Sequence, residues 1–279
     1  MAGYLRPTDL GDALSALKRG NLAVIAGGTD FYPARVERAG SEDVLDISGL
    51  AELRRIRIMP RYIRIGAGVT WTDLIHADLP ASFDGLKLAA REIGGVQIQN
   101  TATLVGNVCN ASPAADSLPN LLALDAEVEL ASLDGRRQMP IGEFVTGNRK
   151  TSRRADELVT ALLVPRTAAE AHSDFLKLGG RKYLIISIVM IASVIEVAQG
   201  VVERARIAVG ACSEIACRLP SLEAALAGQP FGSSLGRAVE AVHLSPLSPI
   251  DDLRASATYR RRAALILLRR SVDRLGAVA

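Results

Sequence analysis

Cysteine and histidine are scarce in this chain of 279 residues, which has three of each. An iron–sulfur cluster ordinarily takes four cysteine ligands at short spacings, so the chain cannot hold one by itself. Cys109, Cys212 and Cys217 give no even disulfide framework, and the histidines lie too far apart in the sequence for metal-ligand spacing. No Ser-His-Asp or paired-carboxylate constellation can be argued, so hydrolytic chemistry is not supported.

Aromatic residues and charge of one sign are also in short supply. Aromatics make up 4% of the chain, and 33 basic residues face 30 acidic ones. This composition predicts no stacking platform for nucleic acid and no dedicated nucleic-acid surface. The arginines at 260–262 and 269–270 are interpreted as a solvated face or a subunit contact.

Long apolar runs are missing as well. The longest, at residues 183–195, is too short to span a bilayer, so no membrane span is expected. The chain starts without the apolar region of a signal peptide. Together with the cysteine usage, this predicts a cytoplasmic location.

Against these absences, the glycine-bearing segment Ala-Gly-Gly-Thr-Asp at residues 26–30 stands out. It follows an apolar run at 22–25 and precedes a stretch, 31–38, that we expect to be helical. Gly27 and Gly28 can take positive φ and carry no Cβ, so successive N–H groups of this turn can form a concavity for an anion. The segment is neither Gly-x-Gly-x-x-Gly nor a P-loop, and such a turn is often only a turn.

A second segment, residues 97–116, has little bulky core material and many short hydrogen-bonding side chains. Such side chains can bind phosphates, ribityl hydroxyls and amide edges, and Gly106 leaves room for close approach. The alternative is a polar loop that satisfies its own backbone. Taken together, the two segments indicate one extended diphosphate ligand held from both sides.

The order of these segments resembles the FAD-binding (medium) subunits of molybdenum hydroxylases, the family of xanthine dehydrogenase and aerobic carbon monoxide dehydrogenase flavoproteins. Members pair a loop like Ala-Gly-Gly-Thr-Asp with one like Thr-Ile-Gly-Gly-Asn-x-x-x-Ala-Ser-Pro-x-x-Asp, here residues 26–30 and 103–116. The resemblance covers nearly the whole chain, because further segments match in order at 45–50, 63–74, 121–126, 175–179, 186–189 and 259–261.

The resemblance implies that FAD is the cofactor of this chain. The first loop would wrap the FAD pyrophosphate and the second would face it. Ser112 would lie in the connecting turn, Asp116 would reach the flavin side, and Ile186 would contact the ring unless it is a core strand residue. The implied cofactor-binding residues are Ala26, Gly27, Gly28, Thr29, Asp30, Thr103, Gly106, Asn107, Ser112, Asp116 and Ile186. No catalytic residue and no metal ligand is expected.

Two positions depart from the family pattern. Val105 stands where the second loop usually has a first glycine. Gly106 is then the only small residue at the point where the cofactor would approach this loop. Ile185 stands where many members have an aspartate, so a carboxylate that could hydrogen-bond near the flavin ring is absent. FAD binding is compatible with both changes, which bear on the tuning of the flavin potential.

Short apolar strands that alternate with helical stretches predict an α+β fold. The resemblance implies a vanillyl-alcohol-oxidase-type FAD-binding domain of two α+β subdomains at residues 1–168. A small C-terminal α+β domain at 169–279, with a three-stranded sheet and helices, would close over the flavin. Strands are expected at 22–25, 61–65, 127–131, 158–164, 175–180, 185–197 and 205–210, helices at 9–19, 71–78, 219–227 and 258–270, and a polar connector at 166–173.

The resemblance further implies an electron-transfer role. A large molybdopterin-binding subunit would hydroxylate the substrate, and a small iron–sulfur subunit with two [2Fe-2S] clusters would relay electrons. The FAD of this chain would pass them to an external electron acceptor, in an assembly expected to be a dimer of heterotrimers. The scarcity of cysteine fits this division, since the clusters would come from a partner chain.

Two alternatives stay open at the level of sequence. A self-contained FAD-dependent oxidoreductase would need its own substrate pocket and an acid/base residue such as Tyr183 or His172. A non-enzymatic nucleotide-binding module is also allowed by the two loops alone.

Overall fold

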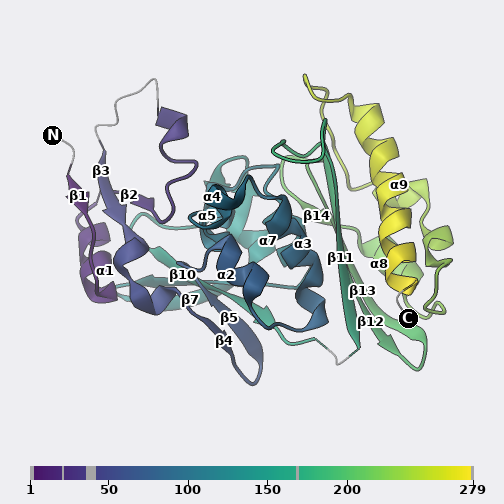
Figure 1. Ribbon diagram of the computed structural model, residues 1–279, viewed down its shortest axis with the longest axis horizontal. Coiled ribbons are helices and arrows are strands. Elements are labelled where there is room, and N and C mark those ends of the chain that lie inside the picture. The colour runs from purple at the N-terminus through teal and green to yellow at the C-terminus, as the bar shows by residue number, and fades with distance from the viewer. Residues whose placement is uncertain (1–2, 21, 36–41, 168–169, 278–279) are drawn as a thin grey trace. The chain divides into compact units, whose positions relative to one another are not determined.

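The computed structural model describes residues 3–20, 22–35, 42–167 and 170–277 (Figure 1). The chain forms two compact units. The first comprises Met1–Ala77, Gly95–Ala111 and Ala126–Pro165, and the second comprises Asp78–Gly94, Ser112–Asp125 and Arg166–Ala279. Helices and strands occur in both, which confirms the predicted α+β class. The expected domain boundary falls at residues 168 and 169, which lie outside the described residues, and it stays a prediction.

The first unit contains a parallel sheet of three strands in the order β1-β3-β2. Helix α1 joins β1 to β2, and it begins where the Asp9 carboxylate accepts hydrogen bonds from the N–H groups of Gly11 and Asp12. The strand expected at 22–25 is confirmed. These elements are β1 (Tyr4–Leu5), α1 (Leu10–Lys18), β2 (Leu22–Ile25) and β3 (Asp43–Asp46).

The first unit also holds an antiparallel sheet in the order β4-β5-β10-β6-β7. Its strands are β4 (Ile56–Ile58), β5 (Tyr62–Gly66), β6 (Glu127–Ser132), β7 (Gly135–Pro140) and β10 (Leu158–Pro165). Strands β5, β6 and β10 confirm the apolar strands expected from the sequence. The remaining elements are α2 (Trp71–His76), α4 (Val96–Gln99), α5 (Leu104–Asn110), α7 (Ile141–Phe144), β8 (Val145–Gly147) and β9 (Lys150–Thr151).

The helix predicted at residues 31–38 is wrong for residues 31–35, which the structure describes. Only a single 3-10 turn, η1 (Pro33–Arg35), forms in the stretch predicted to be helical from residue 31. Residues 36–38 of that stretch lie outside the described residues. The apolar periodicity used for the prediction was short, and short patterns are weak evidence for a helix.

The second unit is built on an antiparallel sheet in the order β11-β12-β13-β14. The three expected strands are present, and the two-residue strand β14 adds a fourth. Strand β11 begins inside the expected connector, and β12 begins later than expected because Leu184, with a φ of 52°, turns the chain before it. The strands are β11 (Ala171–Leu178), β12 (Val189–Ala198), β13 (Val201–Gly210) and β14 (Cys217–Arg218).

Helices cover the sheet of the second unit. Helix α3 packs against β11, and α9 packs against β11 and β12 (Figure 1). Helix α6 packs against β12 and β13. Side chains from β12, β13, α8 and α9 form one core, in which Ile191, Ile207 and Leu268 are fully buried. The helices are α3 (Asp84–Glu92), α6 (Ser117–Ala123), α8 (Pro220–Leu226) and α9 (Ala257–Gly276).

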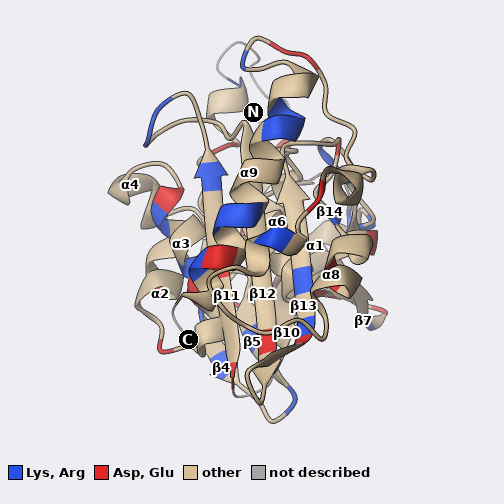
Figure 2. Ribbon diagram, turned by 90° about the vertical axis from the view of Figure 1, so that its right-hand side faces the viewer, with Lys and Arg blue, Asp and Glu red and all other residues tan. Residues whose placement is uncertain are grey.

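The arginines of α9 form bands of positive charge along this helix (Figure 2). Two of the exposed ones also bind backbone carbonyls of nearby loops. Arg261 donates to the carbonyls of Leu244 and Leu247, and Arg269 donates to that of Val239. The interpretation of these arginines as a solvated face or subunit contact is therefore incomplete, because Arg261 and Arg269 also stabilise loops of the chain itself.

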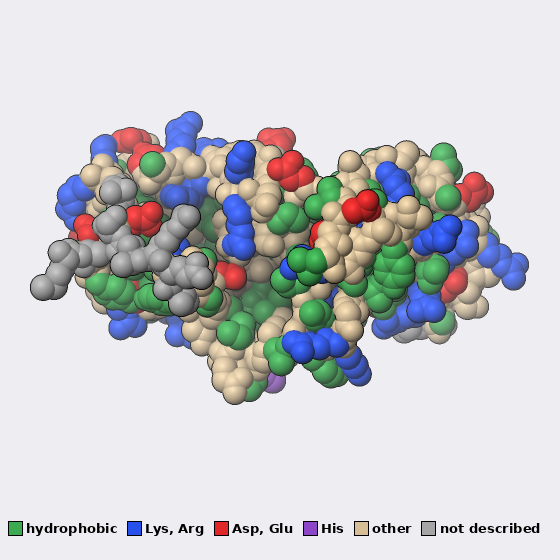
Figure 3. All heavy atoms as spheres, turned by 90° about the horizontal axis from the view of Figure 1, so that it is seen from above, with side chains coloured by type: hydrophobic (Ala, Val, Ile, Leu, Met, Phe, Trp, Pro, Cys, Tyr) green, Lys and Arg blue, Asp and Glu red, His purple; other side chains and the backbone are tan. Residues whose placement is uncertain are grey.

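Charge of both signs is distributed over the surface. On the face shown in Figure 3, Lys, Arg, Asp and Glu side chains lie among hydrophobic ones. Within the described residues, no helix has the length and apolar character needed to cross a membrane.

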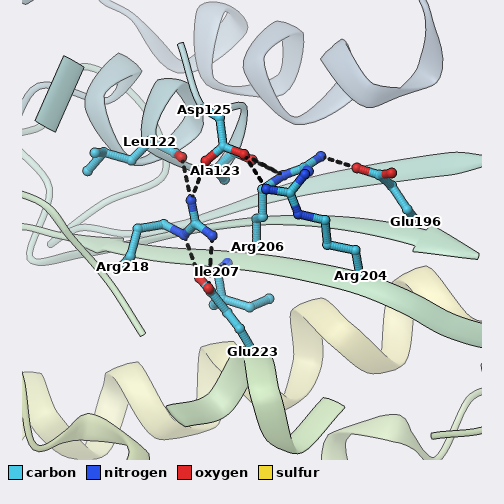
Figure 4. A network of polar contacts seen from close by, with 9 residues as sticks. All are labelled: Leu122, Ala123, Asp125, Glu196, Arg204, Arg206, Ile207, Arg218 and Glu223. Carbon is cyan, nitrogen blue, oxygen red and sulfur yellow. Dashed lines mark hydrogen bonds and ion pairs between the residues drawn. The ribbon is translucent and has the colours of Figure 1, made fainter. Parts of the chain in front are cut away.

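A network of arginines surrounds Asp125 at the C-terminal end of α6 (Figure 4). The Nε of Arg206 donates to the carbonyl of Ala123 at 2.7 Å, and its guanidinium lies 2.6 Å from the carboxylate of Glu196. Arg218 donates to Asp125 at 2.7 Å. Because the last carbonyls of a helix have no partner inside it, these guanidinium groups stabilise the end of α6 against β13 and β14.

Replacing Arg206 with methionine is expected to lower the free energy of unfolding by about 3 kcal/mol, because Glu196 and the Ala123 carbonyl lose a buried partner. Arg204 faces the same Asp125, but its side chain is 57% exposed against 3% for Arg206. Arg204→Met is the matched control and should cost less than about 1 kcal/mol. Urea unfolding of both variants measures the difference, and equal losses would contradict the assignment.

Candidate functional site

The first predicted loop packs directly against the chain that leads into the second. It leaves β2 at Ile25, and Gly28 adopts a φ of 66°, a conformation that favours glycine. A Cβ on Gly27 would lie 2.1 Å from the carbonyl oxygen of Thr101. Glycine at position 27 is thus required for this contact, and the tertiary structure brings the two predicted segments together within the first unit.

Three consecutive backbone N–H groups of the first loop are open. No described residue accepts a hydrogen bond from the N–H of Gly27, Gly28 or Thr29, and all three residues are half-buried. Half-buried backbone donors ordinarily have a partner, so these three are available to a partner outside the described residues. A row of donors of this kind binds anions such as phosphate. The loop therefore fits the diphosphate of FAD.

The second segment is a capped helix over part of its length, and the expectation of a polar loop is wrong there. Thr103 caps α5: its Oγ accepts a hydrogen bond from the N–H of Gly106 at 3.0 Å, and its carbonyl accepts one from Asn107 at 3.1 Å. A Cβ on Gly106 would lie 2.8 Å from that Oγ, so this glycine also serves the cap. The contacts of Thr103, Gly106 and Asn107 with FAD stay predictions.

Val105 does not obstruct the surface of this segment. Its side chain is buried in the core of the first unit, whereas the neighbouring Gly106 is exposed. The helical geometry of α5 explains this, because adjacent residues of a helix point in different directions. The departure from the family pattern at Val105 is therefore accommodated inside the fold.

A chain of hydrogen bonds ties the first loop to the end of α5. The Nδ2 of Asn110 donates to Asp30 Oδ2 at 2.9 Å, and Arg149 donates to Asn110 Oδ1. Arg149, in the turn between β8 and β9, also donates its backbone N–H to the carbonyl of Ala111 at 2.9 Å. Asp30 thus holds the two segments together. Arg149 was missed from the sequence, where nothing distinguishes it from other turn arginines.

In the second unit, Asp116 is part of a buried charged cluster. Lys177 Nζ lies 2.7 Å from Asp116 Oδ2, and the Ser187 hydroxyl donates to Asp116 Oδ1 at 2.7 Å. All three side chains are buried. Lys177 and Ser187 were not among the predicted site residues. The available signal was Lys177 itself, a charge between the apolar residues Leu176 and Leu178.

Burial raises the pKa of Asp116, because desolvation disfavours the carboxylate. The charge of Lys177 and the hydrogen bonds from Lys177 and Ser187 act in the opposite direction. Both oxygens of Asp116 are thereby engaged within the chain. The contact of Asp116 with the flavin stays a prediction. Lys177 and Ser187 hold the Asp116 side chain in place for such a contact.

Ile186 lies in an exposed loop between β11 and β12, next to Ser187 of the buried cluster. Its alternative role as a core strand residue is wrong, since its side chain is 50% exposed. Tyr183 and Leu184 of the same loop are exposed as well. Ile185, in contrast, packs on Gly179, where a Cβ would lie 2.5 Å from Ile185 Cγ2. The loop offers apolar side chains that suit a ring, and the contact of Ile186 with FAD stays a prediction.

Two further residues considered from the sequence, Ser112 and His172, have structural contacts within the second unit. Ser112 lies in a turn, where its hydroxyl accepts a hydrogen bond from the N–H of Ala114 at 3.3 Å. His172 stacks on Phe231 with a distance of 5.3 Å between ring centroids. Because His172 and Lys177 are an odd number of residues apart on β11, their side chains point to opposite faces of the sheet.

Known proteins match the chain over both parts. A family model described as the FAD binding domain in molybdopterin dehydrogenase matches residues 1–167. A second, described as the CO dehydrogenase flavoprotein C-terminal domain, matches residues 174–275. The putative xanthine dehydrogenase FAD-binding subunit of Escherichia coli strain K12 is 32% identical over 264 residues, which cover 93% of this chain and 90% of that protein.

Two other matches agree with these. The nicotinate dehydrogenase FAD-subunit of Eubacterium barkeri is 38% identical over 172 residues, which cover 60% of this chain and 58% of that protein. A chain in the structure of reconstituted CO dehydrogenase from Oligotropha carboxidovorans matches with a TM-score of 0.92 and 26% identity, covering 100% of this chain and 99% of that one. The chain therefore belongs to the FAD-binding subunits of molybdopterin dehydrogenases, the family of xanthine and carbon monoxide dehydrogenase flavoproteins.

Proposed function

We propose that this chain is the FAD-carrying electron-transfer subunit of a multi-subunit molybdenum hydroxylase. The observation that carries the proposal is the row of open N–H donors at Gly27, Gly28 and Thr29, held against Thr101. When bound, FAD supplies the ability to accept and pass on electrons. The residues of this chain bind its diphosphate and fix its orientation.

The division of labour follows from what the chain itself provides. Its three cysteines are free, and two of them, Cys109 and Cys212, have pKa values raised to about 11 and about 12 by burial. A [2Fe-2S] cluster ordinarily takes four cysteine ligands, so we assign the two clusters to a small partner subunit. A large subunit carries the molybdopterin cofactor. The relatives from Escherichia coli and Eubacterium barkeri are named as subunits, which supports this arrangement.

The three subunits assemble as a dimer of heterotrimers in the cytoplasm, and the flavin delivers its electrons to an external acceptor. A self-contained oxidoreductase has no specific support in the geometry, since His172 stacks on Phe231 and Tyr183 lies in an exposed loop.

The test is to produce the chain alone and together with candidate partner subunits. The chain alone is expected to bind FAD in equimolar amount, shown by its visible spectrum, and not to oxidise organic substrates with a dye. Reduction of its flavin by substrate should require both partners. Turnover of an organic substrate by the isolated chain would overturn the subunit proposal, and failure to bind FAD would overturn the cofactor assignment.

A further inference from the structure

Arg260, near the start of α9, is buried, whereas its neighbours Arg261 and Arg262 are exposed. Its Nη1 donates to the carbonyl of Ile188 at 2.6 Å and to that of Ala211 at 3.0 Å. Its Nη2 donates to Asp252 at 2.8 Å. One guanidinium group therefore binds two backbone carbonyls from separate parts of the chain and one carboxylate.

The carbonyl of Ile188 belongs to a segment that carries part of the cluster formed by Asp116, Lys177 and Ser187. Ile188 directly follows Ser187, and its N–H donates to the carbonyl of Leu178 at 2.7 Å, the residue after Lys177. The peptide groups around Ile188 are thus held from two sides. Lys177 directly precedes Leu178, and Ser187 directly precedes Ile188. The hydrogen bond between Leu178 and Ile188 therefore fixes the backbone from which the two side chains of the cluster extend.

Ala211 connects Arg260 with the third member of the cluster. It adopts a φ of 60°, and its N–H donates to the carbonyl of Pro113 at 3.1 Å, shortly before Asp116 in the chain. Arg260 therefore binds the residue that follows Ser187 directly, and it is linked through one further backbone hydrogen bond each to Leu178, next to Lys177, and to Pro113, three residues before Asp116.

The charge of Arg260 is balanced locally. Although desolvation acts to raise it, the pKa of Asp252 falls to about 2, because the N–H groups of Arg254 and Ala255 and the guanidinium of Arg260 stabilise the carboxylate. Asp252 is consequently ionised at neutral pH and pairs with Arg260. The influence of Arg260 on Asp116 is thus exerted through the backbone contacts rather than as a free charge.

We infer that Arg260 is a positioning residue for the flavin site, which sets the geometry of the Asp116, Lys177 and Ser187 cluster through the carbonyls of Ile188 and Ala211. The consequence for the flavin rests on the proposed function. The consequence for the cluster itself does not, because it concerns contacts within the chain.

The test compares Arg260→Met with Arg261→Met in the full chain. Arg261 also donates to two loop carbonyls, those of Leu244 and Leu247, but these lie away from the cluster in the sequence. Arg260→Met is expected to raise the Kd for FAD about tenfold, the ratio that corresponds to one lost charge-assisted hydrogen bond. Arg261→Met should leave the Kd within about twofold, and because Arg261 is exposed it should lower Tm less than Arg260→Met does.

Adding Arg260→Met to a chain that already carries two substitutions in the cluster separates positioning from general destabilisation. In a chain that already carries Asp116→Asn and Lys177→Met, adding Arg260→Met should change the Kd for FAD by less than about twofold, because neighbouring residues that act together are not additive. If the tenfold effect persists in that background, Arg260 does not act through the cluster and the inference is wrong.

A readout in the flavin-free chain keeps the inference apart from the proposed function. The ammonium group of Lys177, held at 2.7 Å by Asp116, should give a slowly exchanging NMR signal in the parent chain and in Arg261→Met. The signal should be lost or shifted in Arg260→Met. An unchanged signal would overturn the inference, whereas a parent chain that binds no FAD but shows the expected signals would overturn only the proposed function.

Discussion

Gly27→Ala is expected to raise the Kd for FAD by at least about 100-fold, since it disturbs more than one hydrogen bond to the diphosphate. The added Cβ would lie 2.1 Å from the Thr101 carbonyl oxygen and 2.9 Å from Ala102 Cα. Both are backbone atoms, so the loop must move as a whole and its open N–H groups leave their present alignment. Fluorescence titration of flavin-free chain with FAD measures the loss.

Two further variants make the result interpretable. In Gly28→Ala the Cβ meets the ring of the exposed Tyr32 at 2.8 Å, which can swing aside, although the φ of 66° disfavours alanine. We expect a smaller rise in Kd, about tenfold. Gly232→Ala meets no atom within 4 Å and is the control. If folded Gly27→Ala binds FAD as tightly as Gly232→Ala, the first loop is not the diphosphate site.

Lys177→Met is expected to lower the free energy of unfolding at pH 7 by about 3–5 kcal/mol, because it leaves the Asp116 carboxylate buried without its counter-charge. Lys177 and Asp116 are both nearly inaccessible to solvent, so water cannot replace the lost ammonium group. Adding Asp116→Asn should recover most of the loss by removing the unpaired charge. Lys182→Met, at an exposed position nearby in the sequence, is the control and should leave the unfolding midpoint unchanged.

The loss in Lys177→Met should also depend on pH in a defined direction. Burial already raises the pKa of Asp116 above its ordinary value of 3.8, and removing Lys177 removes the charge that opposes this rise. A carboxyl whose pKa is higher in the folded chain binds its proton more tightly there, so stability is greatest below the unfolded value and falls as pH rises through the folded pKa. The variant should be closest to the parent in acid. A deficit that grows on acidification would contradict this.

Much of the secondary structure was predictable because it depends on local patterns. Short runs of apolar residues that include β-branched ones, such as those at β2 and β10, favour strands. The errors occurred where local patterns were weak. Residues 185–188 continue an apolar run, yet the positive φ of Leu184 and the hydrogen bonds from Arg181 to its carbonyl keep them in a loop.

The candidate site was predictable only in its chemistry. A backbone turn such as Gly27 to Thr29 shows in the sequence that it can bind an anion, because its glycines leave successive N–H groups uncovered. The partners of Asp116 could not be predicted from the sequence, since Lys177 and Ser187 lie 61 and 71 residues away along the chain. No local pattern encodes a contact at such a separation.

The sequence by itself determined the α+β class, the family and the loop that suits a diphosphate, since these depend on residue types and their order. Only the tertiary structure decided that Gly27 must be glycine because Thr101 lies against it, that Thr103 and Gly106 form a helix cap, and that Asp116 is paired with Lys177. The physical reason is that close packing and charge pairing are set by distances between segments, and those distances exist only once the chain has folded.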